Sequence, residues 1–133
     1  MSSPTASLRQ TFAGIATALD PATLSLHHQI FQRTDAYADL QQLKYMRDQI
    51  VSVHNRTRLM QAVEAAFDSD IALLCHLHGS LSPEDVFLCL MSYMHFTTHD
   101  VATCLGVTDE ASRKRRSRLR QKLSEDSVLL FFS

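Results

Sequence analysis

Residues 107–123 read VTDEASRKRRSRLRQKL, and the interpretation of the whole chain starts from this stretch. Seven of the thirteen Lys and Arg residues fall between Arg113 and Lys122. Residues 1–112 carry six basic and twelve acidic groups, a net charge of −6, and residues 123–133 carry −2. The total of −1 therefore conceals a segment of +7. A basic helix on an acidic body is typical of a nucleic-acid-binding protein, although many charge runs are only solvated helix faces.

The composition indicates one all-α domain with an appended element. Hydrophobic residues make up 45% of 133 residues, enough for a core, and three Gly and three Pro leave few turns. The three cysteines, Cys75, Cys89 and Cys104, lack metal-ligand spacing and are interpreted as structural thiols. No leader pattern opens the sequence, and no run of about 20 apolar residues suggests a membrane span. We therefore expect a cytoplasmic protein that does not enter the membrane.

The N-terminal region, residues 1–78, is predicted to be helical and to serve in dimerisation or interaction. An amphipathic pattern predicts a first helix from Ser7 to Leu19, and Asp20-Pro21 is typical of a helix start. No Gly or Pro follows until Gly79, so the longest helix is expected from the thirties to Phe67. Its apolar stripe comprises Leu40, Leu43, Met46, Ile50, Val53, Met60, Val63 and Phe67.

This stripe leaves two hypotheses open. The helix could pair with a second copy, giving a homodimer through residues 40–67, or it could pack within its own domain. We favour the homodimer, because the C-terminal domain is small and an uncovered stripe would form a large apolar patch.

The C-terminal region, residues 79–133, has strong helix-boundary signals. A helix over Ile71–His78 is expected to end at Gly79 in the left-handed conformation. Ser82-Pro83 predicts the next helix start, and Thr97 to Asp100 a second cap. A helix over Thr98–Leu105, a turn at Gly106 and a basic helix over 109–123 capped by Thr108 then follow. This order is that of a helix-turn-helix.

The basic helix is predicted to bury a thin stripe of Ser112, Arg116, Leu119 and Leu123. Its exposed face would hold Arg113, Lys114, Ser117, Arg118 and Gln121. The apolar tail Val128 to Phe132 must be covered, either by the N-terminal helices or by a second subunit.

Residues 81–123 resemble the LuxR-type (GerE-like) helix-turn-helix domain. The family pattern is roughly L-T-x-x-E, then a helix, S-x-x-E-I-A-x-x-L-x-I-S, and a recognition helix ending K-L. Here the corresponding residues are LSPED at 81–85, TTHDVA at 97–102, LGVT at 105–108 and KL at 122–123. The basic ending is most similar to the variant found in Bacteroidetes regulators. The chain departs from the family at His95, where Gly is usual, and at Ser112, where an apolar residue is usual.

The resemblance implies a four-helix domain in a bacterial transcription regulator that binds double-stranded DNA. Base edges would be read by Arg113, Lys114 and Ser117, and phosphates contacted by Arg115, Arg116, Arg118 and Arg120. Thr98 and Thr108 complete the predicted DNA-binding set. The alternative is a protein-interaction module, in which a degenerate helix-turn-helix docks an acidic signalling protein or sigma factor.

Enzymatic chemistry is not expected. The pairs His27-His28 and His76-x-His78 do not share a helix face, and His95 and His99 straddle a predicted turn. The sequence contains no phosphate-binding loop or nucleophile elbow. We therefore predict no metal, no cofactor and no catalytic residue.

Overall fold

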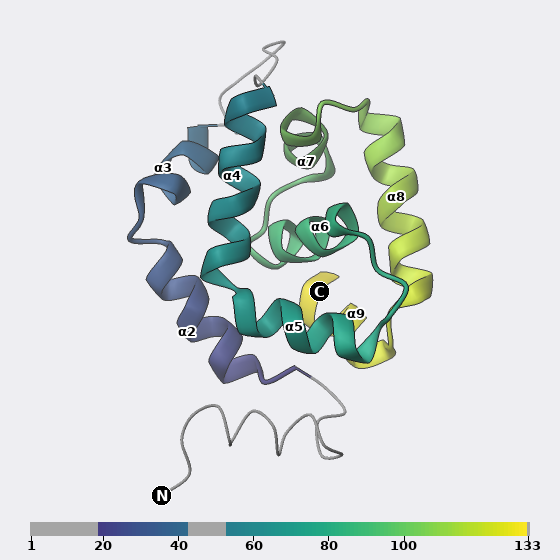
Figure 1. The fold of residues 1–133 in the computed structure, drawn as a ribbon. Coiled ribbons are helices and arrows are strands. Elements are labelled where there is room, and N and C mark those ends of the chain that lie inside the picture. Colours follow the sequence, from purple (N-terminus) through teal and green to yellow (C-terminus); the bar gives the residue numbers. More distant parts are fainter. Residues whose placement is uncertain (1–18, 43–52, 133) are drawn as a thin grey trace, which may run out of the picture.

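The computed structural model describes residues 19–42 and 53–132, and all its regular structure over these residues is helical (Figure 1). This confirms the predicted all-α class. The helices are α2 (Pro21–Phe31), α3 (Asp35–Gln42), α4 (Val53–Ala66), α5 (Asp68–Leu77), α6 (Pro83–Tyr93), α7 (Thr98–Leu105), α8 (Asp109–Lys122) and α9 (Glu125–Phe132). Within the described ranges, no helix has the length and apolar character needed to cross a membrane.

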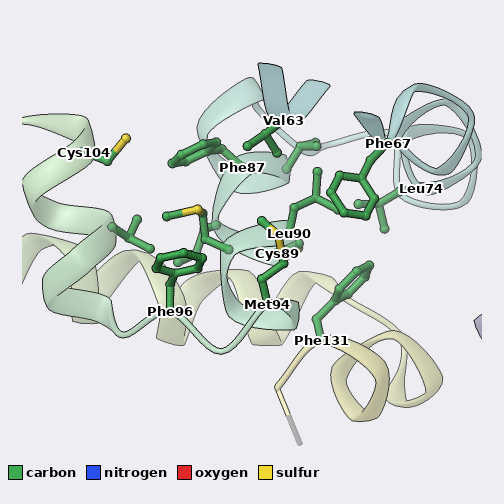
Figure 2. Close-up of a cluster of buried hydrophobic side chains, with 14 of the residues drawn as sticks. Val63, Phe67, Leu74, Phe87, Cys89, Leu90, Met94, Phe96, Cys104 and Phe131 are labelled. Atoms are coloured by element: carbon green, nitrogen blue, oxygen red, sulfur yellow. The ribbon is translucent and has the colours of Figure 1, made fainter. Parts of the chain in front are cut away.

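Helix α6 is the centre of the packing. Every residue from Asp85 to Met91 is buried, so the helix has no solvent face in this stretch. A helix that is apolar all round must be covered on every side, and α4, α7, α8 and α9 all pack against α6. Figure 2 shows Phe87 and Leu90 of α6 between Phe96 and Cys104 on one side and Phe67, Leu74 and Phe131 on the other.

Side-chain caps define the starts of three successive helices. The Ser82 hydroxyl accepts from the Asp85 N–H at 3.1 Å, and the Thr97 hydroxyl accepts from the Asp100 N–H at 3.1 Å. The Thr108 hydroxyl accepts from the Ala111 N–H at 3.1 Å. Each bond satisfies an amide that the first helical turn leaves unpaired. The predicted starts of α6, α7 and α8 are therefore confirmed.

Helix α2 begins as predicted, with Asp20 as N-cap. Its carboxylate accepts from the Ala22 N–H at 3.2 Å, and Pro21 occupies the first turn. The helix predicted over Ser7–Leu19 lies outside the described residues apart from Leu19.

The prediction of one long helix from the thirties to Phe67 is wrong. Helix α3 ends at Gln42, and α4 begins at Val53. Arg58 and Asp39 form an ion pair at 2.9 Å, yet on one continuous helix they would lie about 28 Å apart along the axis. Helix α3 instead packs against α4.

The apolar stripe is not exposed in the way that the dimer hypothesis requires. Leu40, Val63 and Phe67 are fully buried within a single copy of the chain. They cannot remain exposed for a second copy, so the argument that a monomer would leave them uncovered was wrong. The stripe residues Leu43, Met46 and Ile50 lie outside the described residues.

Helix α5 differs from the prediction at both ends. It runs from Asp68 to Leu77 instead of Ile71 to His78. Its C-cap residue, His78, has φ −134° and ψ 84°. Among the described residues, positive φ values occur at His95 and Gly106, so Gly79 does not take the predicted left-handed conformation.

The apolar tail forms α9 and is covered mainly by α6 of the same chain. Phe131 is fully buried, and its ring lies 6.4 Å from that of Tyr93 in an edge-to-face arrangement. The expectation named the N-terminal helices or a second subunit and did not foresee the contact with α6. Leu129 remains exposed.

His95 ends α6 in an unusual way for a residue with a side chain. It has φ 66°, and its N–H donates to the Ser92 carbonyl at 3.0 Å. The next amide, of Phe96, donates to the Met91 carbonyl at 2.9 Å. This bond pattern is the Schellman motif, whose left-handed position usually holds glycine. The position where the sequence departs from the LuxR pattern is therefore one that favours glycine.

The His95→Gly variant should be more stable than the wild type by about 0.5–1 kcal/mol, because glycine removes the Cβ strain at positive φ. Urea unfolding measures the difference. His95→Ala keeps the Cβ and serves as the control, with an expected change of under about 0.5 kcal/mol. Equal effects of the two substitutions would show that backbone strain is not the cause.

Candidate nucleic-acid interface

Helices α7 and α8 pack directly against each other and are joined by a short turn at Gly106, Val107 and Thr108. Gly106 has φ 70°, and the Val107 N–H donates to the Ala102 carbonyl at 3.0 Å. These features end α7 at Leu105, and α8 begins after three intervening residues, at Asp109. Two helices joined by a three-residue turn, as predicted, are therefore present in the structure.

Ser112 fastens α8 to the start of α7. Its side chain is buried, and its hydroxyl donates to the Thr98 carbonyl at 2.7 Å. A buried hydroxyl without a partner would destabilise the contact, but this one is satisfied. The polar residue at this position is therefore compatible with close packing of α8 against α7. Leu119 and Leu123 continue the buried strip, as predicted.

The outward face of α8 carries a cluster of polar and basic side chains. Arg113, Lys114, Ser117 and Arg118 line an open surface depression together with Glu110. Gln121 is also exposed, so the predicted exposed face is confirmed. Helix α8 lies along one edge of the molecule, on the far side from α2 and α3 (Figure 1).

Lys114 is only weakly engaged on this face. Its ammonium lies 3.2 Å from the Glu110 carboxylate, with 68% and 71% of the two side chains exposed. Such exposed pairs contribute little to stability and are easily exchanged for another anion.

Arg116 and Arg120 point away from this face, toward α9. Their guanidinium carbons lie 5.2 Å and 5.9 Å from the centre of the Phe132 ring. Arg116 is half-buried, and its buried Nε has no hydrogen-bond partner in the structure. The structure thus separates these two arginines from Arg113, Lys114 and Ser117. Sequence reasoning did not foresee the stacking, because no local pattern links Phe132 to α8.

The flank of α8 that lies opposite the α9 flank faces the start of α6. Arg115, Arg118 and Lys122 line a second depression with Ser82 and Asp85. The Lys122 ammonium lies 3.2 Å from the Asp85 carboxylate, which also accepts from the Ser82 N–H at 3.1 Å. Burial favours a higher pKa for Asp85, but these bonds outweigh it and hold the pKa below its ordinary value. Lys122 therefore has a structural partner.

The two predicted threonines lie at helix starts. Thr108 is exposed and caps α8, and Thr98 is half-buried at the first position of α7.

Acidic groups gather at the N-terminal end of α8. Besides Glu110, Asp109 lies there and accepts a bond of 2.8 Å from His99 Nδ1. The tip of the basic helix is thus acidic.

Other side chains with reactive groups lie outside the exposed face of α8. His27 Nδ1 lies 2.6 Å from the buried Asp70 carboxylate, whose pKa is raised by burial against the opposing effect of His27. Burial raises the pKa of Cys104 to about 11, and Cys75 is exposed. No group of three or more His, Cys, Asp or Glu residues suited to a metal ion occurs in residues 19–42 and 53–132.

Comparison of the chain with protein-family models, with curated proteins and with solved structures finds no match. The resemblance to LuxR-type domains therefore remains a prediction from the sequence.

Two lysines of α8 should respond differently to the same substitution. Lys122→Met leaves the buried Asp85 carboxylate without its ammonium partner and should cost about 1–2 kcal/mol of stability at pH 7. Lys114→Met removes only an exposed pair and should cost under about 0.5 kcal/mol. Urea unfolding of both variants provides the comparison.

The loss of stability caused by Lys122→Met should become smaller as the pH falls. Because the folded-state pKa of Asp85 is lowered, its stabilisation is complete above an unfolded pKa of about 3.9 and is lost as the pH falls through the folded value. The difference between wild type and Lys122→Met should shrink in that acidic range. A difference that persists in acid would rule out the ion pair as its source.

Proposed function

We propose that this protein is a DNA-binding transcription regulator that reads the major groove with α8. The observation that carries the proposal is the uncovered basic face of Arg113, Lys114, Ser117 and Arg118 on α8, the second of two helices joined by a three-residue turn. A helix fits the major groove of B-DNA, where base edges present distinct donor and acceptor patterns.

Arg113, Lys114 and Ser117 are the proposed base-reading residues, because they share the outward face. The guanidinium of Arg113 can donate two parallel bonds to guanine O6 and N7. Glu110 lies on the same face, and a carboxylate can accept from cytosine N4. The acidic tip of α8 would then contribute to selectivity, while repelling phosphates that approach it too closely.

The remaining arginines flank the base-reading face on both sides and are proposed to contact phosphates. Arg115 and Arg118 lie toward α6, and Arg116 and Arg120 lie toward α9. Phe132 holds the latter pair at the edge of α8. A helix inserted in the groove has a phosphate strand on each side, so two flanking sets match that geometry. Thr98 and Thr108 would approach the backbone from the helix starts.

A second candidate function is a protein-interaction module in which the same basic face docks an acidic signalling protein. The basic side chains of this face can pair with carboxylates as well as with phosphates, and Lys114 already pairs with Glu110 of its own helix at 3.2 Å. An acidic protein surface supplies carboxylates, whereas DNA supplies phosphates in a fixed helical array. Binding to duplex DNA therefore separates the two functions.

If α8 binds the DNA backbone, affinity for a random-sequence duplex should fall steeply with salt, with a log–log slope of about −0.9 per phosphate contacted. Fluorescence anisotropy over a range of salt concentrations measures this slope. Absence of binding at low salt, or binding indifferent to salt, would remove the DNA proposal.

The matched variants are Arg118→Ala, on the proposed interface, and Arg33→Ala, an exposed arginine between α2 and α3. Arg118→Ala should reduce the slope by about 0.9 if it removes one phosphate contact. Arg33→Ala removes the same charge from the connection between α2 and α3, which lie on the far side of the molecule from α8 (Figure 1), and should leave the slope unchanged.

We further propose that two copies bind together, because a single helix-turn-helix buries a small DNA interface and dimers gain a second half-site about one helical turn away. The stripe within residues 40–67 is largely internal where it is described. An alternative contact is Leu26 and Ile30, one turn apart on α2, with 54% and 56% of their surfaces exposed.

Light scattering should therefore give the mass of a dimer at tens of micromolar, and Ile30→Asp should reduce it by placing charge in an apolar contact. Gln29→Asp, at an exposed position on the same helix, controls for added charge. A monomeric mass for the unaltered chain would end the dimer proposal without affecting DNA binding.

A further inference from the structure

Helix α4 lies outside the helix-turn-helix but contacts its turn through Arg56. The Arg56 Nη1 donates to the Leu105 carbonyl at 3.0 Å, across 49 residues of sequence. Leu105 is the last residue of α7, and its carbonyl has no partner within the helix. A guanidinium is well suited to this place, because cations stabilise the negative end of a helix dipole.

The same guanidinium occupies the space beside Gly106. A Cβ added to Gly106 would lie 1.7 Å from Arg56 Nη1 and 2.9 Å from Cζ. The left-handed backbone favours glycine at this position, and any larger residue there would also displace the guanidinium of Arg56. The guanidinium packs directly on the turn that joins α7 to α8.

The groove beside Arg56 is also lined by one residue of the proposed recognition helix. Arg56 and Arg115 line one groove of about 340 Å³ between α4, the start of α6 and the end of α7. Helix α4 is connected to the other N-terminal helices by the Arg58–Asp39 pair and by packing against α2 and α3. A displacement of α4 would therefore move a group that is bonded to the helix-turn-helix.

We propose that Arg56 is a positioning residue that holds the α7–α8 turn and so fixes the orientation of the recognition helix. This inference rests on the proposed function, because it assigns the N-terminal helices a role in DNA binding. Arg56 acts here through the turn and makes no contact with DNA itself.

The first test needs no DNA. Gly106→Ala, Arg56→Ala and the double variant are compared by urea unfolding. In the wild-type background, alanine at 106 must both strain the backbone and displace the guanidinium. In the Arg56→Ala background only the backbone strain remains. The effect of Gly106→Ala on the unfolding equilibrium should therefore be at least about threefold smaller in that background. Additive effects would overturn the proposed hold on the turn.

The second test measures duplex affinity and its salt slope for Arg56→Ala. Positioning predicts a loss of about fivefold or more, comparable to ordinary coupling between sites, with an unchanged slope. A slope reduced by about 0.9 would instead show that Arg56 contacts a phosphate, and unchanged affinity would show that it does not position α8. Either result overturns the proposal.

The matched control is Arg58→Ala, which removes an arginine from the same helix that pairs with Asp39. It should leave affinity within about twofold of wild type, because its partner lies outside the helix-turn-helix. If the wild-type chain binds no duplex at all, the proposed function fails, and the unfolding comparison alone decides whether Arg56 holds the turn.

Discussion

The structure depends on the burial of α6 on all sides. Seven consecutive residues, Asp85 to Met91, have no solvent face, so other helices must surround them. Helices α4, α7, α8 and α9 meet this requirement. The arrangement makes α8 one wall of the core, with its inner strip against α6 and α7 and its outer face in solvent. The orientation of the basic helix thus follows from the covering of its apolar neighbour.

The charge of α8 limits how it can be covered. Seven basic residues between 113 and 122 leave only Ser112, Leu119 and Leu123 to form the buried strip. Removing the charged side chains from water would cost more free energy than additional packing could contribute. The charges are instead accommodated by Phe132 on one flank, by Asp85 on the other, and by solvent on the outward face. That distribution leaves a free basic face, which is the basis of the proposed function.

The sequence predicted those features that are determined locally. Hydroxyl caps at Ser82, Thr97 and Thr108 identified the helix starts, because a cap and its amide partner lie within three residues. The exposed and buried sides of α8 followed from helical periodicity. Long-range contacts were not predictable in this way. No Gly or Pro in the sequence signals that α3 and α4 are separate helices. The separation is evident only from tertiary contacts, the Arg58–Asp39 ion pair and the burial of Leu40. The stacking of Arg116 on Phe132 and the bond of Arg56 to Leu105 likewise join distant parts of the chain.

The central claim is that the outward face of α8 is the surface that binds DNA. Backbone amide chemical shifts, followed by NMR during titration with a short duplex, test it most directly. The claim predicts that the largest changes occur over Glu110–Arg118 and at the start of α7, with little change in α2 and α3. Changes concentrated on Leu26 and Ile30, or on the exposed side of α9, with none on α8, would contradict the account.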